Sequence, residues 1–99
     1  MNKEEISKEK YYINGEFFYN IDIENEIKKY IKHIDIFVTK EFDTIYAKGT
    51  YQNVHCQIQL EEYYLYHDYN NFLQHVALDI YHLISKEYFL KEVENERAS

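Results

Sequence analysis

Hydrophobic and polar positions alternate most regularly near the middle of the chain, over residues 54–61. One set of alternate positions is mainly apolar: Val54, Cys56, Ile58 and Leu60. The positions between them are polar: His55, Gln57, Gln59 and Glu61. Because successive side chains of a β-strand point to opposite faces, this pattern predicts a strand with one buried face and one face in water.

Two further strands are expected before this one. The segments 34–39 and 44–51 are rich in β-branched and aromatic residues, which favour strands. Residues 40–43 are typical of a turn between these segments, and Gln52-Asn53 would form the next turn. Short connections of this kind join antiparallel neighbours, so the three segments predict an antiparallel meander.

A helical period is found on both sides of the predicted meander. Isoleucines recur at positions 23, 27, 31 and 34, so each is about one helical turn from the next. Asp22 is a suitable N-cap, and together these features predict a helix over about residues 22–33. A second apolar stripe predicts a long helix over about residues 69–90. Its members are Phe72, Leu73, Val76, Ile80, Leu83, Ile84 and Tyr88.

Near the N-terminus, aromatic residues flank the pair Asn14-Gly15, which favours a type I′ turn because both positions take positive φ. Residues 11–19 are therefore predicted as a hairpin, with one longer strand kinked at Gly15 as the alternative. The whole pattern predicts a two-layer α+β domain over residues 11–91: a hairpin or strand, a helix, a three-strand antiparallel meander and a long C-terminal helix. Polar tails are expected over residues 1–10 and 92–99.

The charge of the chain is distributed unevenly. Its 99 residues carry a formal net charge of −7, and the interval between Lys48 and Lys86 contains no lysine or arginine. That interval holds six tyrosines, four histidines and four carboxylates. Such a chain repels nucleic acid and anionic membranes and attracts cationic proteins. We therefore expect a basic protein partner, with no direct binding to nucleic acid or membrane.

The densest acidic and aromatic stretch is Glu61–Tyr69, which leaves the third strand and leads into the last helix. The alternate tyrosines of an extended segment cannot all be buried, so some are expected at the surface. Tyrosine gives a large contact area at a small loss of entropy, and neighbouring carboxylates pair with arginine and lysine. The predicted partner-binding residues are Glu61, Glu62, Tyr63, Tyr64, Tyr66, Asp68, Tyr69 and Asp79. A tyrosine-rich face is equally suited to a homodimer.

Metal binding and catalysis have weaker signals in the sequence. His75, Asp79 and His82 have spacings that would place zinc ligands on one face of a helix, but they also flank its apolar stripe. Cys56 is the one cysteine, and it alternates with core positions, where a thiol is unreactive. With glycine only at positions 15 and 49, there is no glycine-rich phosphate loop. We expect no catalytic residue, no bound metal and no cofactor.

In length, charge, tyrosine content and a composition typical of AT-rich coding sequences, the chain resembles anti-CRISPR proteins, the small acidic inhibitors of phages and mobile elements. The resemblance covers about Asp22–Leu90, and it implies a helix-flanked three-strand sheet with acidic loops that occupy a site meant for DNA. The segment Ile13-Asn14-Gly15-Glu16, followed by a helix, also resembles the start of barstar-type ribonuclease inhibitors. Both resemblances imply an acidic protein that inhibits a basic enzyme.

The function implied is that of a non-catalytic inhibitor in the cytoplasm of a bacterial host. Its acidic, tyrosine-rich surface would bind a nucleic-acid-processing enzyme or ribonucleoprotein, and would mask the nucleic-acid site or mimic the nucleic acid. A CRISPR effector is the target that the resemblance favours. An antitoxin or immunity protein that neutralises a basic toxin is the first alternative. A metal-dependent enzyme or sensor built on His75, Asp79 and His82 is the second.

Overall fold

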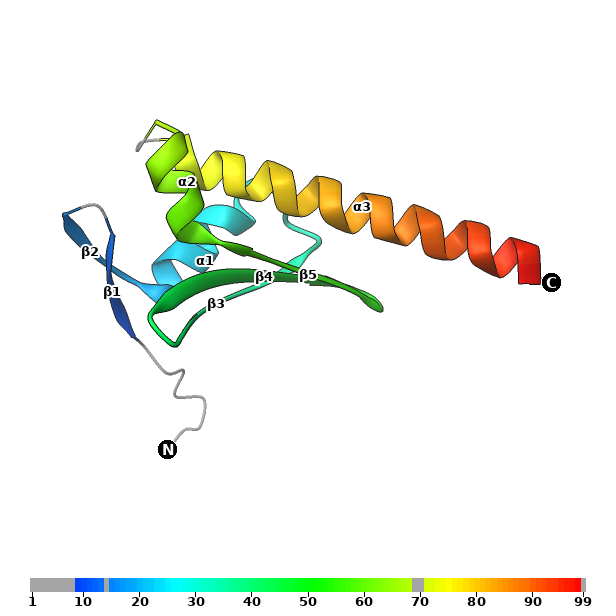
Figure 1. Ribbon diagram of the computed structural model, residues 1–99, viewed down its shortest axis with the longest axis horizontal. Helices are drawn as coiled ribbons and strands as arrows, with labels where there is room; N and C mark the ends of the chain where they lie inside the picture. The colour runs from blue at the N-terminus through cyan, green and yellow to red at the C-terminus, as the bar shows by residue number, and fades with distance from the viewer. Residues whose placement is uncertain (1–8, 14, 69–70, 99) are drawn as a thin grey trace.

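The computed structural model describes residues 9–13, 15–68 and 71–98, with side chains as far as Glu94. The elements along the chain (Figure 1) are β1 (Lys10–Ile13), β2 (Glu16–Tyr19), α1 (Asn20–Lys28), β3 (Asp35–Glu41), β4 (Thr44–Tyr51), β5 (Val54–Gln59), α2 (Leu60–Tyr66) and α3 (Phe72–Ala98). The strands form a two-strand sheet, β1-β2, and a three-strand antiparallel sheet, β3-β4-β5. The predicted α+β fold is confirmed, including the meander and the long C-terminal helix.

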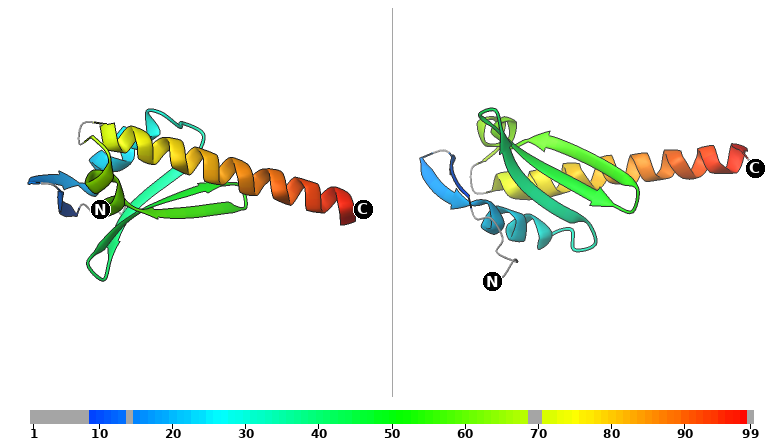
Figure 2. Two further views of the ribbon diagram at one scale, coloured as in Figure 1. Left: turned by 45° about the horizontal axis from the view of Figure 1, so that its top comes forward. Right: turned by 90° about the horizontal axis from the view of Figure 1, so that it is seen from below.

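The three-strand sheet has one covered face and one open face. α1 and α3 lie over the same face, as the two views of Figure 2 show. The core fills the space between these helices and the sheet, with fully buried side chains that include Ile23, Ile27, Val38, Ala47, Val76 and Ile80. On the opposite face, His55, Gln57 and Gln59 are exposed, as the alternation in β5 predicts.

The N-terminal segment is a hairpin, which decides between the two predicted alternatives. Ile13 is paired with Glu16, and Gly15 in the connection has a φ of +89°. Glycine takes this left-handed conformation without steric strain. Tyr11 and Ile13 point into the core and are 4% and 0% exposed, so the hairpin is packed against the rest of the domain. Residues 1–8 of the predicted N-terminal tail lie outside the described residues.

α1 ends at Lys28 instead of near residue 33 as predicted. Its start is held by two hydrogen bonds to one residue: Asn20 N donates to Glu9 O at 2.8 Å, and Glu9 N donates to Asn20 Oδ1 at 2.9 Å. After Lys28 the chain turns, yet Ile31 and Ile34 are buried. Buried loop residues therefore continue the apolar period beyond the helix, which explains the wrong boundary.

The strand predicted over residues 54–61 ends at Gln59, and the short helix α2 begins at Leu60. This corrects the expectation that Glu61 lies on the open face of the sheet. Leu60 is fully buried, and Tyr63 and Tyr64 are partly buried one turn later, which is a helical spacing. Because Leu60 satisfies both the strand period and the helical period, alternation could not locate this boundary.

α3 begins at Phe72 and continues to Ala98, beyond the end predicted near residue 90. Residues 92–98, which were assigned to a polar tail, are therefore helical. The last turns of α3 project past the end of the sheet, as Figure 1 shows. Within the described residues, no helix has the length and apolar character needed to cross a membrane.

α3 approaches the sheet closely at Gly49 of β4. A Cβ atom built on Gly49 would lie 2.7 Å from Cγ2 of Ile80 and 3.4 Å from Cγ2 of Ile34. Ile80 is fully buried, and its Cγ2 is bonded directly to Cβ, so rotation of a distant bond cannot move it away. The position of α3 on the sheet therefore requires a residue without a side chain at position 49.

We predict that Gly49→Ala destabilises the fold by about 1–3 kcal/mol, because the added methyl group overpacks the contact with Ile80. Urea denaturation followed by circular dichroism measures this change. In an Ile80→Ala background the same substitution should cost less, because the clashing methyl group is absent. An equal loss in both backgrounds would show that the contact between helix and sheet is not the cause.

Candidate functional site

Glu61 connects α2 with the sheet and is only partly exposed. Its Oε2 accepts a hydrogen bond from the backbone N of Ile45 at 3.1 Å, and Oε1 lies 3.4 Å from the same nitrogen. The pairing of β4 with β5 begins one residue later, where Tyr46 is opposite Gln59. The carboxylate thus takes the place of a further strand residue beside β4. Glu61, a predicted partner-binding residue, therefore has a role in folding.

Tyr63 and Asp79 connect α2 with α3. The hydroxyl of Tyr63 donates a hydrogen bond to Oδ2 of Asp79. Burial raises the pKa of Tyr63 above its ordinary value, and the hydrogen bond and negative charge of Asp79 raise it further. Asp79 is exposed, but this bond occupies one of its oxygens. These two predicted residues are therefore brought together by the fold.

A stack of three rings strengthens the connection between α2 and α3. The ring centroids of Tyr63 and His67 are 5.2 Å apart, with 18° between the ring planes. Those of His67 and His75 are 4.2 Å apart, with 21° between the planes. Tyr63 belongs to α2, His67 follows its last turn, and His75 lies in α3. The sequence could not predict this stack, because the contact of His67 with His75 depends on how the chain turns between the helices.

Tyr64 packs against the edge of the core. Its ring meets that of Phe72 edge-on, with centroids 6.0 Å apart and an interplanar angle of 78°. Burial raises the pKa of Tyr64, and the charge of Glu61 raises it to a smaller extent. Tyr64 is thus partly buried by intramolecular contacts, although the sequence placed it in the binding site.

The exposed side of α2 carries Glu62, Leu65 and Tyr66, and the exposed Asp68 lies two residues beyond the end of the helix. Tyr66 is 79% exposed and Leu65 is 71% exposed. Asp68 accepts a hydrogen bond through Oδ2 from Nδ2 of Asn71 at 3.1 Å. We call Glu62, Leu65, Tyr66 and Asp68 the α2 surface. Leu65 was not predicted, because its exposure follows from the helical spacing of α2.

The carboxylates of the α2 surface are not paired with lysine or arginine among the described residues. The salt bridges in that part of the chain join Lys29 to Glu26 and Lys48 to Glu41. Within the described part of the chain, the charge of Glu62 and Asp68 is therefore not neutralised by a lysine or arginine. Tyr69, the remaining predicted residue, lies outside the described residues.

The predicted metal ligands are engaged in other contacts. Among the described residues, no group of three or more His, Cys, Asp or Glu side chains is arranged to hold a metal ion. His75 is stacked on another histidine, Asp79 accepts a hydrogen bond from a tyrosine, and His82 lies beside Tyr81 with ring centroids 5.8 Å apart. Burial raises the pKa of the Cys56 thiol, which disfavours the reactive thiolate.

Comparison with known proteins gives no further guide to function. No protein-family model, curated protein or solved structure matches the chain. The functional argument therefore depends on the exposure, charge and contacts of the residues themselves. The α2 surface brings together the exposed side chains of the segment from α2 to Asp68.

We predict that Glu61→Ala lowers the free energy of unfolding by about 1–3 kcal/mol, because the buried backbone N–H of Ile45 loses its acceptor. Glu62→Ala is the matched control, since Glu62 is the exposed neighbour on the same helix and should change stability by less than about 0.5 kcal/mol. Urea denaturation of the two variants gives both values. Equal losses would contradict the folding role assigned to Glu61.

We also predict a loss of stability at alkaline pH that depends on Tyr63. Its pKa is higher in the folded state than the ordinary value of about 10, so the folded state holds the phenol proton more tightly. This stabilisation is fully present below about pH 10 and is lost as the pH rises further. Denaturation between about pH 8 and about pH 11 should show a shallower decline for Tyr63→Phe.

The control for this experiment is Tyr66→Phe, which removes the hydroxyl of a residue that is 79% exposed. This variant should keep the pH dependence of the unmodified protein. If Tyr63→Phe also keeps it, the bond between Tyr63 and Asp79 does not contribute to the alkaline transition.

Proposed function

We propose that the protein is a non-catalytic inhibitor that binds a basic nucleic-acid-processing enzyme through the α2 surface. The observation that carries this proposal is the exposure of Tyr66 and Leu65, at 79% and 71%, close to two carboxylates. A partner that covers these two side chains would remove apolar area from water. Glu62 and Asp68 would then pair with arginine or lysine at the rim of the contact.

The net charge of −7 supports a cationic partner. Complementary charge steers the encounter of two proteins and raises the rate of association. An enzyme groove that normally binds nucleic acid has the required positive surface, because it must neutralise phosphates. The inhibitor would compete with nucleic acid for that groove and would need no chemistry of its own.

The contacts described above divide the predicted residues into two groups. Glu61, Tyr63, Tyr64 and Asp79 make contacts within the fold, and in this proposal they hold α2 in position. The α2 surface, with Tyr66 as its aromatic anchor, would make the contact with the partner. The proposed contact is therefore smaller than the one expected from the sequence.

The resemblance to anti-CRISPR proteins makes CRISPR effector ribonucleoproteins the first enzymes to test. A basic toxin would present a similar electrostatic surface. The inhibitor and antitoxin functions therefore differ in the partner and share the same mode of binding.

We predict that Tyr66→Ala weakens binding to the partner by about 2 kcal/mol, roughly thirtyfold in Kd, because it removes the aromatic anchor. Glu62→Lys should mainly slow association, since it reverses a charge at the rim of the contact. Competition with target DNA for the effector measures inhibition, and surface plasmon resonance separates the two rates.

A suitable control is Glu87→Lys, which changes the net charge by the same amount at an exposed position of α3. It should retain most of the binding. An equal effect of Glu87→Lys and Glu62→Lys would assign the interaction to net charge and not to the α2 surface. Full inhibition by both Tyr66→Ala and Glu62→Lys would contradict the proposed function.

A further inference from the structure

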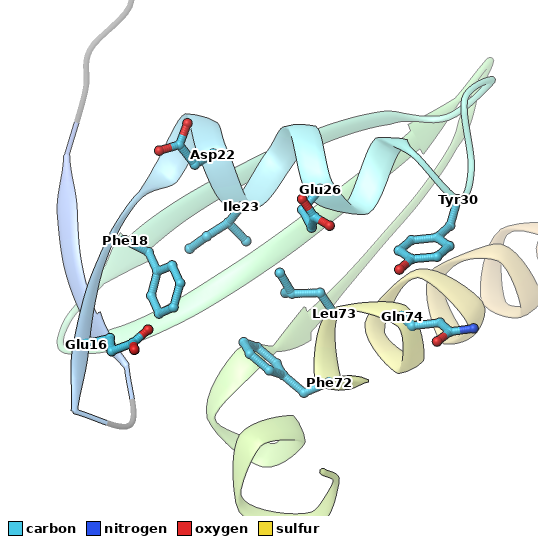
Figure 3. A pocket seen from close by; sticks show the side chains of 9 residues that line it. All are labelled: Glu16, Phe18, Asp22, Ile23, Glu26, Tyr30, Phe72, Leu73 and Gln74. Atoms are coloured by element: carbon cyan, nitrogen blue, oxygen red, sulfur yellow. The ribbon is translucent and has the colours of Figure 1, made fainter. Parts of the chain in front are cut away.

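A groove separate from the α2 surface opens between the β1–β2 hairpin, α1 and the first turn of α3. Its volume is about 400 Å³, within the range of about 300–1,000 Å³ that is usual for ligand pockets. Figure 3 shows that its walls come from three parts of the chain: β2 at one end, α1 along one side and α3 along the other. The groove is therefore formed by the tertiary fold and has no sequence motif.

The inner part of the groove is apolar. Phe18 of β2, Ile23 of α1, and Phe72 and Leu73 of α3 all line it. Ile23 and Phe72 are 1% and 4% exposed, so they are core side chains whose edges form the bottom of the groove. Phe18 and Leu73 pack against the core and are partly exposed. Aliphatic or planar groups can be covered here without contact with a polar surface.

The rest of the lining is acidic or neutral. Glu16 of β2 and Glu26 of α1 lie on different walls of the groove in Figure 3, and Asp22 lies one turn before Glu26. Among the described residues that line the groove there is no lysine, arginine or histidine. Glu26 is paired with Lys29 at 3.2 Å, but the two side chains are 44% and 67% exposed, and such a surface pair is weak. The groove therefore has negative charge around an apolar interior.

We propose that this groove binds an arginine side chain of a basic partner protein. Arginine has an aliphatic stem that suits an apolar wall, and a planar guanidinium group that stacks on aromatic rings. In the groove, the stem would lie along Leu73 and Ile23, and the guanidinium would reach Phe18 and the carboxylate of Glu26. Its positive charge is delocalised and weakly hydrated, so it loses less on leaving water than the compact charge of lysine. The class of partner rests on the proposed function, whereas the groove itself can be tested without that partner.

The groove and the α2 surface lie at the same end of the molecule. Phe72 lines the groove, and Tyr64 of α2 packs against the ring of Phe72 at 6.0 Å. A partner with basic residues on two neighbouring segments would meet carboxylates in both places. Two such contacts on one partner reinforce each other, because the second forms at a high effective concentration.

The first test is a titration of the isotope-labelled protein with N-acetyl-arginine amide, followed by NMR. Methyl signals of Ile23 and Leu73 and ring signals of Phe18 should shift and saturate. N-acetyl-citrulline amide has nearly the same shape without the charge, and it should bind at least fivefold more weakly at matched ionic strength. Equal shifts with the two probes, or shifts that do not include these residues, would overturn the proposal.

The second test uses the double variant Asp22→Asn with Glu26→Gln, which removes two charges and keeps the side-chain shapes. Its affinity for N-acetyl-arginine amide should fall on the order of fivefold, as expected for partly exposed ion pairs. Asp43→Asn is a control that removes one charge away from the groove. Asp43 is exposed in the β3–β4 turn at a φ of +72°, where asparagine is well tolerated. An equal loss in the control variant would contradict the groove as the binding site.

The outcomes also separate this inference from the proposed function. If arginine does not bind while Tyr66→Ala still reduces inhibition, the groove proposal fails and the α2 surface stands. If arginine binds in the groove and the α2 variants inhibit normally, the groove stands and the α2 surface is contradicted.

Discussion

The close approach of α3 to the sheet is the constraint on which the other contacts depend. The lack of a side chain at Gly49 allows Ile80 to lie directly against β4. At this distance from the sheet, Asp79 accepts a hydrogen bond from Tyr63 of α2, and His75, one turn earlier, stacks on the histidine that follows α2. The first turn of the same helix forms a wall of the groove. A helix held farther out would separate these pairs, so one backbone contact positions both candidate binding regions.

Acidic residues have two different roles in this fold. Glu24 of α1 accepts a hydrogen bond from the backbone N of Val38 at 2.8 Å, and Glu61 of α2 accepts one from Ile45. Both carboxylates satisfy strand amides that have no neighbouring strand as an acceptor. At Val38 and Ile45 the strand amide is therefore not open to pairing with another chain. Part of the acidic composition therefore serves folding, and the net charge alone overstates the surface that is available for binding.

The sequence predicted the elements best where only one period fits the residues. The strand over residues 44–51 and the turn at Gln52-Asn53 have the predicted bounds. The predicted boundaries were wrong where one residue fits both a strand and a helix, as Leu60 does. They were also wrong where buried loop residues continue the spacing of a helix, as Ile31 and Ile34 do. The candidate site was predicted as a stretch of chain, but its exposed side was not. A helical spacing brings Leu65 to the same side as Glu62 and Tyr66, whereas strand alternation would place Leu65 on the opposite face from both. The groove is formed by elements that are far apart in the sequence, so no local sequence pattern predicts it.

Contacts within the fold explain the positions of some tyrosines of α2 but not the exposure of Tyr66. Tyr63 and Tyr64 are accounted for by their contacts with α3, whereas Tyr66 is 79% exposed beside a leucine that is 71% exposed. A single exposed apolar side chain is ordinary, but this pair lies on the exposed side of a short helix. It is close to two carboxylates that form no ion pair with a lysine or arginine among the described residues. A second copy of the chain would bring its own net charge of −7 to the same contact, and like charges oppose association. The chemistry of this end of the molecule therefore favours a basic protein over a homodimer.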